Sequence, residues 1–186
     1  MRKFAAVLMA GGQSRRMGVD KALLDYHGKP LWCLQMEKLT QLGPEQLFFS
    51  VRQQMEFPSG SWRFVHDHAA NMGPLGGLEA ALRLTSDEFL VALAVDMPAM
   101  TAKFLSTLLE KAGPAGVVPH FNGFYHGASA VYPIRILPLV ERVLQSADRS
   151  FQHLIREALP LGIMKAQEIE PAESGLFENW NSPDDL

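Results

Sequence analysis

The sequence predicts an α/β domain built on a mostly parallel β-sheet, and two observations lead to this fold class. Short apolar runs with strand character alternate with segments that carry apolar residues at three- and four-residue spacing, which is the period of an amphipathic helix. The run FLVALAV at residues 89–95 is apolar throughout, as expected for a central strand that is covered on both faces. This alternation is typical of parallel strands joined by right-handed helical crossovers.

The predicted strands are the apolar runs that lie between turns and helical segments. They cover residues 4–9, 46–51, 62–67, 89–95, 115–120 and 128–133. The predicted helices cover residues 30–43, 75–84, 101–113, 134–145 and 150–160. Pro30 stands at a first-turn position and Gly43 at the end of its helix, which is the usual helix punctuation. Thr101 is an expected N-cap and Gly113 an expected stop, whereas Pro138 must lie in a first turn or kink its helix.

Composition limits both the domain organisation and the class of protein. The chain has 186 residues, enough for one domain with its own core, and no linker divides it, so we expect a single domain over residues 1–186. A net charge of −3 gives no overall basic field, so we expect no nucleic-acid partner. One cysteine excludes an internal disulfide and an all-cysteine metal site. No apolar run approaches the roughly 20 residues that span a bilayer, so we expect a cytoplasmic protein without a membrane partner.

Ligands of open α/β sheets bind beyond the carboxyl ends of the strands, and the first strand is followed by the loop AGGQSRRMGVDK. Glycines such as Gly11 and Gly12 let backbone N–H groups approach an anion, and Arg15, Arg16 and Lys21 supply charge for phosphates. The spacing matches neither the dinucleotide fingerprint nor the P-loop. We interpret this loop as a nucleoside triphosphate site, although a flexible glycine-rich turn with solvated cations also fits the pattern.

Two aspartates follow predicted strands directly. Asp96 comes after the central strand, where a carboxylate is costly unless it is paired or binds a metal, and Mg²⁺ prefers one or two carboxylates together with phosphate oxygens and water. Asp67 stands before a loop and helix that begin with GPLGG at residue 73, where free N–H groups suit an anion. The alternative role of both aspartates is to cap a helix or turn.

Polar side chains near the C-terminus form the pattern NWN, with Asn179 and Asn181 on either side of a tryptophan. Their amides suit a phosphate or a second substrate, and a turn network fits them equally. None of the histidines stands at zinc-ligand spacing. His126, in a glycine-flanked loop before a strand, is a candidate for facing a ligand, whereas His153 is expected on a helix surface.

Several of these motifs together resemble one known family. The stretches MAGGQSRRMGVDKALL, GKPL, GPLGGL, DMP and NWNSPDDL occur in the order found in MobA-type molybdenum cofactor guanylyltransferases, which belong to the nucleotidyltransferase superfamily. The resemblance runs from Val7 to the last residue, and the first stretch is its most specific part.

The resemblance implies a three-layer αβα Rossmann-like nucleotidyltransferase fold with a mostly parallel mixed sheet. It also implies a Mg²⁺-dependent transfer of GMP from GTP to the terminal phosphate of molybdopterin or the molybdenum cofactor, with transient contacts to cofactor-delivery proteins or molybdoenzymes. By the same resemblance, the catalytic residues are Lys21, Arg16 and Asp96. The residues that match its binding positions are Met9, Ala10, Gly11 and Gly12 for the nucleotide, Arg16 and Lys21 for phosphates, Asp67 near the nucleotide, Asp96 for Mg²⁺, and Asn179 and Asn181 near the pterin-bearing substrate.

Besides the mild change of the usual leucine to Met9, the sequence departs from the family pattern at two places. Val51 precedes Arg52 where the family often has Asn-Arg, and Gly127 follows His126 where a His-Pro pair is common. Two other readings therefore stay open: a nucleotidyltransferase that uses CTP or another acceptor, and a GTP-binding partner protein without catalysis. The Gly11-Gly12 pair speaks for a purine nucleotide, because cytidylyl relatives tend to have Ala-Gly there.

Overall fold

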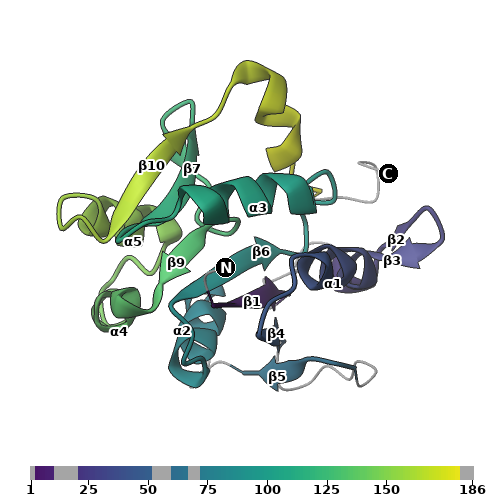
Figure 1. Cartoon of the computed structure of the whole chain (residues 1–186), viewed down its shortest axis with the longest axis horizontal. Coiled ribbons are helices and arrows are strands. Elements are labelled where there is room, and N and C mark those ends of the chain that lie inside the picture. Colours follow the sequence, from purple (N-terminus) through teal and green to yellow (C-terminus); the bar gives the residue numbers. More distant parts are fainter. Residues whose placement is uncertain (1–2, 11–20, 52–59, 67–71, 181–186) are drawn as a thin grey trace.

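The computed structural model describes residues 3–10, 21–51, 60–66 and 72–180, and its centre is a mixed β-sheet (Figure 1). The strands of this sheet follow the order β10-β7-β9-β6-β1-β4-β5, with β8 paired to β7. Their bounds are β1 Phe4–Met9, β4 Gln46–Ser50, β5 Arg63–Val65, β6 Phe89–Ala94, β7 Gly116–Phe121, β8 Phe124–Tyr125, β9 Val131–Pro133 and β10 Met164–Glu168. A separate hairpin pairs β2 (Asp25–Tyr26) with β3 (Lys29–Pro30).

Most of the sheet is parallel, as the sequence predicts. Strand β1 pairs in parallel with both β4 and β6, β4 with β5, and β7 with β10. Strand β9 is the exception, because it runs antiparallel between β6 and β7. The sheet is therefore mixed, and its parallel half brings the carboxyl ends of β1, β4 and β6 to one edge.

Each predicted helix is present in the structure. The helices are α1 Leu31–Gln41, α2 Pro74–Leu84, α3 Ala102–Lys111, α4 Leu137–Leu144 and α5 Phe151–Ala158, with 3₁₀ turns η1 Lys21–Leu23, η2 Ile134–Ile136 and η3 Pro171–Phe177. The Thr101 hydroxyl accepts a hydrogen bond from the Phe104 N–H at 3.2 Å, which confirms the predicted N-cap. Pro138 lies in the first turn of α4, where no intrahelical hydrogen bond needs its missing N–H.

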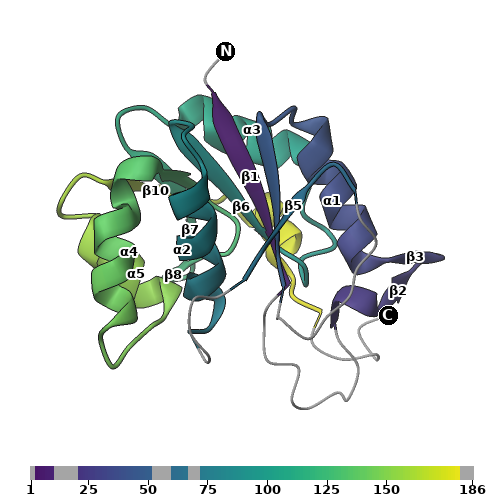
Figure 2. The ribbon, with the colours of Figure 1, turned by 90° about the horizontal axis from the view of Figure 1, so that it is seen from below.

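Two hydrophobic cores lie on the two faces of the sheet. Successive residues of β1 alternate between them, with Ala6 and Leu8 in one core and Ala5 and Val7 in the other. Helices α1 and α3 cover the first face, and α2, α4 and α5 cover the second (Figures 1 and 2). The result is the expected three-layer αβα arrangement, with a central strand that is buried on both faces.

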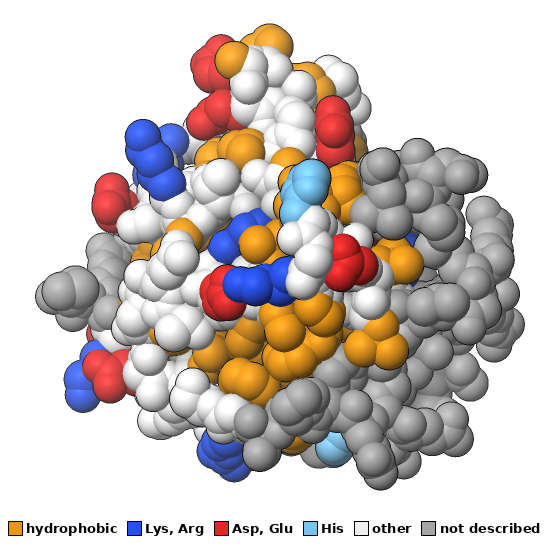
Figure 3. All heavy atoms as spheres, turned by 90° about the vertical axis from the view of Figure 1, so that its right-hand side faces the viewer, with side chains coloured by type: hydrophobic (Ala, Val, Ile, Leu, Met, Phe, Trp, Pro, Cys, Tyr) orange, Lys and Arg blue, Asp and Glu red, His pale blue; other side chains and the backbone are white. Residues whose placement is uncertain are grey.

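The edges of the sheet are less completely covered than its centre. Every residue of β1 is buried, whereas Arg63 and Phe64 of the edge strand β5 are exposed. Figure 3 views the molecule from the side of α1 and the β2–β3 hairpin and shows apolar surface in the middle of this face. Within the described part of the chain, no helix has the length and apolar character needed to cross a membrane.

The sequence did not indicate β2, β3, β8 or β10. Strand β10 has the sequence MKAQE, and only Met164 in it is buried. Because β10 is an edge strand paired only with β7, its side chains need not be apolar, so the apolar pattern that identifies central strands is absent.

Candidate active site

A pocket of about 750 Å³ opens at the carboxyl ends of β1 and β6. These two strands end side by side, because Met9 pairs with Ala94 in the parallel register. The segments that follow them contribute Ala10 and Asp96 to the pocket wall. This is the edge of the sheet where open α/β proteins bind ligands.

One end of the pocket is charged. The Lys21 ammonium lies 3.3 Å from Asp96 Oδ2, and the two residues are 75 positions apart in the chain. Their side chains are 21% and 26% exposed, so the pair is shielded from bulk solvent but still open to the pocket. We call this the charged end, and it presents one cation and one carboxylate to the same ligand space.

The start of helix α2 borders the same pocket. Gly73 has a φ of +64° and a ψ of −164°, a backbone conformation that is almost restricted to glycine, and it turns the chain into Pro74 at the first position of α2. Gly73, Pro74 and Gly77 line the pocket. The N-terminus of a helix favours anions, so α2 adds a second source of positive potential near Lys21.

The C-terminal segment reaches the charged end through the backbone. The Trp180 N–H donates to the Asp96 carbonyl at 2.9 Å, and Asn179 lines the pocket. The ring of Trp180 also packs against Tyr26 of the β2–β3 hairpin, with ring centroids 4.8 Å apart. The structure thus brings Asn179 and Trp180, the first two residues of the NWN motif, next to the aspartate that follows β6.

The other end of the pocket is aromatic. It is lined by Phe124 and Tyr125 of β8, by His126, and by Phe151 at the start of α5. Phe124 is 53% exposed, and the His126 ring lies 5.3 Å from the Phe124 ring and 4.3 Å from the Phe177 ring between centroids. We call this the aromatic end, and its flat side chains suit a planar ring system.

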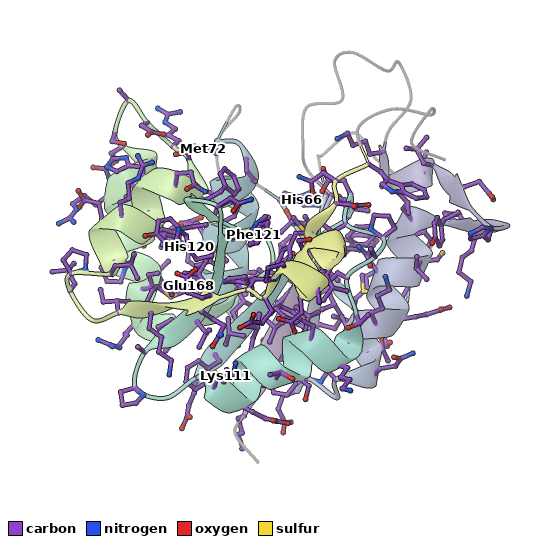
Figure 4. All side chains as sticks on the ribbon, turned by 90° about the horizontal axis from the view of Figure 1, so that it is seen from above. His66, Met72, Lys111, His120, Phe121 and Glu168 are labelled. Carbon is purple, nitrogen blue, oxygen red and sulfur yellow. The ribbon has the colours of Figure 1, made fainter. Side chains whose placement is uncertain are left out.

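The ionisation of His126 follows from this packing. Burial among aromatic rings lowers the pKa of the His126 imidazole, and the nearby His120 lowers it further. His120 itself contacts Glu168 through Nδ1 at 2.6 Å, joining β7 to β10 (Figure 4). His126 therefore presents a neutral ring at neutral pH, and its place in the pocket wall agrees with the expectation that it faces a ligand.

The glycine at position 127, one of the two departures from the family pattern, is explained by the lack of space for a side chain. A Cβ atom on Gly127 would lie 2.7 Å from Cβ of Phe151, which is closer than carbon atoms approach without displacement. The Gly127 carbonyl also accepts a hydrogen bond from the Tyr132 hydroxyl. Phe151 thus occupies the space that a side chain at position 127 would need, and a proline there would displace the residues of the aromatic end.

Val51, the other departure, is part of the core. Its side chain is 2% exposed, its N–H donates to the Val65 carbonyl, and its own carbonyl contacts His66 Nδ1 at 3.1 Å. This position therefore packs between β4 and β5 and presents no polar side chain to the pocket.

The loop between α4 and α5 contributes pocket residues that sequence reasoning missed. Asp148 and Arg149 of this loop, together with Gln152 in the first turn of α5, line the pocket. The Gln152 amide donates to the Tyr125 carbonyl at 2.6 Å, and its oxygen accepts from the Tyr125 N–H at 3.2 Å, so it fixes β8 against α5. The sequence signal available for this loop was the DRS triplet at residues 148–150, where the predicted helix begins. Its serine is a good helix cap, and Ser150 does cap α5 by accepting a hydrogen bond from the His153 N–H.

The predicted site residues divide into two groups. The structure places five of them in the wall of the pocket at the ends of β1 and β6: Met9, Ala10, Lys21, Asp96 and Asn179. The others lie outside the described residues: Gly11, Gly12, Arg16, Asp67 and Asn181.

Asp96 suits a magnesium ion shared with a phosphate ligand. The described residues include no group of three His, Cys, Asp or Glu side chains that could hold a metal by themselves. Mg²⁺ at a phosphate site needs only one or two protein carboxylates, because phosphate oxygens and water complete its octahedron. The half-shielded Asp96 carboxylate at the pocket wall meets this requirement.

Comparisons with known proteins identify relatives of this chain by sequence and by structure. A family model described as "MobA-like NTP transferase domain" matches residues 6–161. A probable molybdenum cofactor guanylyltransferase from Opitutus terrae is 33% identical, over 97% of this chain and 92% of that protein. A molybdenum cofactor guanylyltransferase from Pseudomonas putida is also 33% identical, over 97% of this chain and 94% of its own length.

Solved structures show the same fold. The molybdopterin-guanine dinucleotide biosynthesis protein A from Archaeoglobus fulgidus superposes with a TM-score of 0.76 and 25% identity, covering 98% of this chain and 94% of that one. A nucleotidyl transferase from Methanothermobacter superposes with a TM-score of 0.77 at 18% identity, over 98% of this chain and 94% of its own, which supports the fold alone.

Proposed function

Because the chain belongs to the family of MobA-like NTP transferases, we propose that it is a molybdenum cofactor guanylyltransferase. It transfers GMP from GTP to the terminal phosphate of molybdopterin or the molybdenum cofactor and releases pyrophosphate. The observation that carries this proposal is the charged end, where Lys21, Asp96 and the start of α2 meet at the carboxyl ends of β1 and β6. The eight-stranded sheet takes strands from both the N-terminal and the C-terminal parts of the described chain, which supports a single catalytic domain over residues 1–186.

The reaction needs positioning and charge neutralisation rather than a nucleophilic side chain. An oxygen of the acceptor phosphate forms a bond to the α-phosphorus of GTP, and the bond from this phosphorus to the bridging oxygen of the β-phosphate breaks. The electron pair leaves with pyrophosphate. Because the acceptor phosphate is already an anion, no base has to activate it, and the protein's task is to hold two anions in line.

Lys21 and Asp96 divide the work at the charged end. Lys21 offers its ammonium to the triphosphate, where negative charge develops on the leaving pyrophosphate. Arg16, which follows β1 in the chain, has the same proposed role. Asp96 would hold Mg²⁺, which when bound would supply positive charge to offset the charge of the phosphates. Lys21 and Asp96 also pair with each other, with 3.3 Å between Nζ and Oδ2.

The aromatic end is the proposed place of the acceptor. Phe124 and His126 present flat surfaces for its fused ring system, in the manner in which bases stack on aromatic side chains. Arg149 lines the same region, and its Nη1 lies 3.8 Å from Sδ of Met72, next to the start of α2. This guanidinium in the pocket wall suits the acceptor phosphate.

A two-stage experiment tests the proposal. Thermal unfolding is first measured with GTP, ATP, CTP and UTP, each with and without Mg²⁺. A ligand that binds only the folded state adds about 2.7 kcal/mol at a hundredfold excess over its dissociation constant, so GTP with Mg²⁺ should give the largest shift. Formation of guanine dinucleotide and pyrophosphate is then measured with molybdenum cofactor, for the wild type and for Asp96→Ala.

The outcomes separate this proposal from the alternatives. A larger shift with CTP than with GTP would assign the site to a cytidylyltransferase. A shift with GTP but no pyrophosphate in the presence of acceptor would assign a binding protein without catalysis. Equal product from the wild type and Asp96→Ala would refute the role of the charged end.

A further inference from the structure

The segment that carries Asp96 is held from a helix in another layer of the molecule. Gln35 lies on the inner face of α1 with 0% exposure. Its Nε2 donates to the Ala94 carbonyl at 3.1 Å and to the Met97 carbonyl at 2.7 Å. These two carbonyls lie on either side of Asp96 in the chain, so one amide group clamps the backbone before and after the aspartate.

Neighbouring contacts complete this arrangement. Lys38, one turn after Gln35 on the same face of α1, donates from Nζ to the Pro98 carbonyl at 2.6 Å. The Trp180 N–H donates a hydrogen bond to the carbonyl of Asp96 itself, and the Val95 N–H donates one to the Met9 carbonyl. The carbonyls of residues 94, 96, 97 and 98 thus all accept hydrogen bonds from outside the segment.

The amide oxygen of Gln35 contributes nothing to this clamp. Among the residues that the structure describes, no group donates to Gln35 Oε1, although this atom is buried. An unsatisfied buried acceptor costs free energy, and the neighbours Leu31, Met36 and Leu39 show that an apolar side chain would suit this face of the helix. Rotating the amide would be worse, because it would point Oε1 at two carbonyl oxygens that cannot donate.

We propose that Gln35 is a positioning residue for Asp96, which clamps the peptide units around the aspartate so that its carboxylate faces Lys21 and the phosphates of the nucleotide. The inference rests on the proposed function, because it assigns Asp96 to the metal and the nucleotide. The clamp restricts the directions in which the Asp96 carboxylate can point. This restriction matters because Mg²⁺ accepts only a narrow range of ligand directions, and the orientation of a ligating carboxylate depends on the groups that hold it.

The test replaces Gln35 by methionine, which keeps the length and packing of the side chain and removes the donor. Binding of Mn²⁺ is measured by electron paramagnetic resonance in the presence of GTP and the absence of acceptor. Loss of a supporting contact of this kind weakens metal binding roughly 10–100-fold, so Gln35→Met should raise the dissociation constant by about tenfold or more. Backbone amides of Val95 and Met100 should also exchange their hydrogens faster, because their hydrogen bonds flank the released segment.

Thr40→Val is the matched control. Thr40 lies on the same helix, and its hydroxyl donates to the Met36 carbonyl at 2.9 Å, so the variant loses a side-chain hydrogen bond without touching residues 94–98. It should keep the metal affinity and the exchange rates of the wild type. Higher Mg²⁺ should restore GMP transfer by Gln35→Met, which a merely structural defect would not allow.

Three results would overturn the proposal. One is a lower melting temperature of Gln35→Met with unchanged Mn²⁺ affinity and unchanged exchange at Val95 and Met100. Another is equal weakening of metal binding in Gln35→Met and Thr40→Val. The third is failure of both Gln35→Met and the shorter Gln35→Asn to fold, which would make Gln35 a structural residue. Should the wild type bind Mn²⁺ with GTP but transfer no GMP, the proposed function fails while the clamp is still tested by metal affinity and exchange.

Discussion

The two ends of the pocket are built in different ways. The charged end joins residues that are far apart in the chain, such as Lys21 and Asp96, because parallel strands deliver their carboxyl ends to one edge of the sheet. The aromatic end comes from an antiparallel hairpin and the start of α5, where Gln152 ties β8 in place. Under the proposed function, the fold itself dictates where the phosphates bind, whereas the surface proposed for the acceptor is added by local elements.

The largest expected effect is at the charged end. Asp96→Asn keeps the shape of the side chain and removes its charge, so it should reduce the rate of GMP transfer by roughly 10²–10³, as the loss of one preorganised electrostatic contact does. The rate of pyrophosphate release at saturating GTP measures this. Melting temperature serves as the control, because a large loss of stability would mean that Asp96 acts through the fold.

A change at the aromatic end should affect only one substrate. Phe124→Ala removes the exposed ring, and stacking on one aromatic side chain is worth about 1–3 kcal/mol, so KM for the acceptor should rise roughly tenfold or more. The thermal shift produced by GTP should stay as in the wild type. If GTP binding fell as well, the two ends would not be separate sites, and the comparison would be wrong.

A smaller effect is expected from the cap of helix α5. Ser150→Ala removes the acceptor for the His153 N–H and should lower the free energy of unfolding by about 1 kcal/mol. For a chain of this size that corresponds to a fall of roughly 2–4 °C in melting temperature. Calorimetry checks it, with Ser106→Ala on the exposed side of α3 as a control whose melting temperature should hardly change.

The smallest expected effect is a pH dependence of the stability of the fold, which arises from His126 at the aromatic end. Burial and the nearby His120 lower the pKa of His126 in the folded protein, so the unfolded chain takes up a proton first as the pH falls. Stability should therefore fall as the pH drops below about 6.5, the ordinary value for histidine, and level off below the pKa of the folded state. In His126→Gln this part of the pH profile of the melting temperature should flatten, and an unchanged slope would assign it to other groups.

The same contrast explains how much could be predicted from the sequence. Strands β1 and β6 and helix α1 were predicted because their burial imposes apolar runs and helical spacing, and the sites at their ends followed from topology. Strand β10 and the β8 hairpin were missed because exposed edge strands carry no such pattern. Arg149, in the loop before α5, and Gln152, in the first turn of α5, were missed because polar side chains in short loops and at helix ends look alike whether they face solvent or a pocket.

The contact between Trp180 and the carbonyl of Asp96 has a thermodynamic consequence. Under the proposed function, a ligand that contacts Asn179 or Trp180 and a ligand that contacts Asp96 both act on this hydrogen bond, so the binding of one should change the free energy of binding the other. This coupling is reciprocal by thermodynamic linkage. If the first substrate changes the affinity for the second by some factor, the second changes the affinity for the first by the same factor. Random and ordered addition of the two substrates would then differ in kinetics only, since the free energy of the ternary complex is the same by either route.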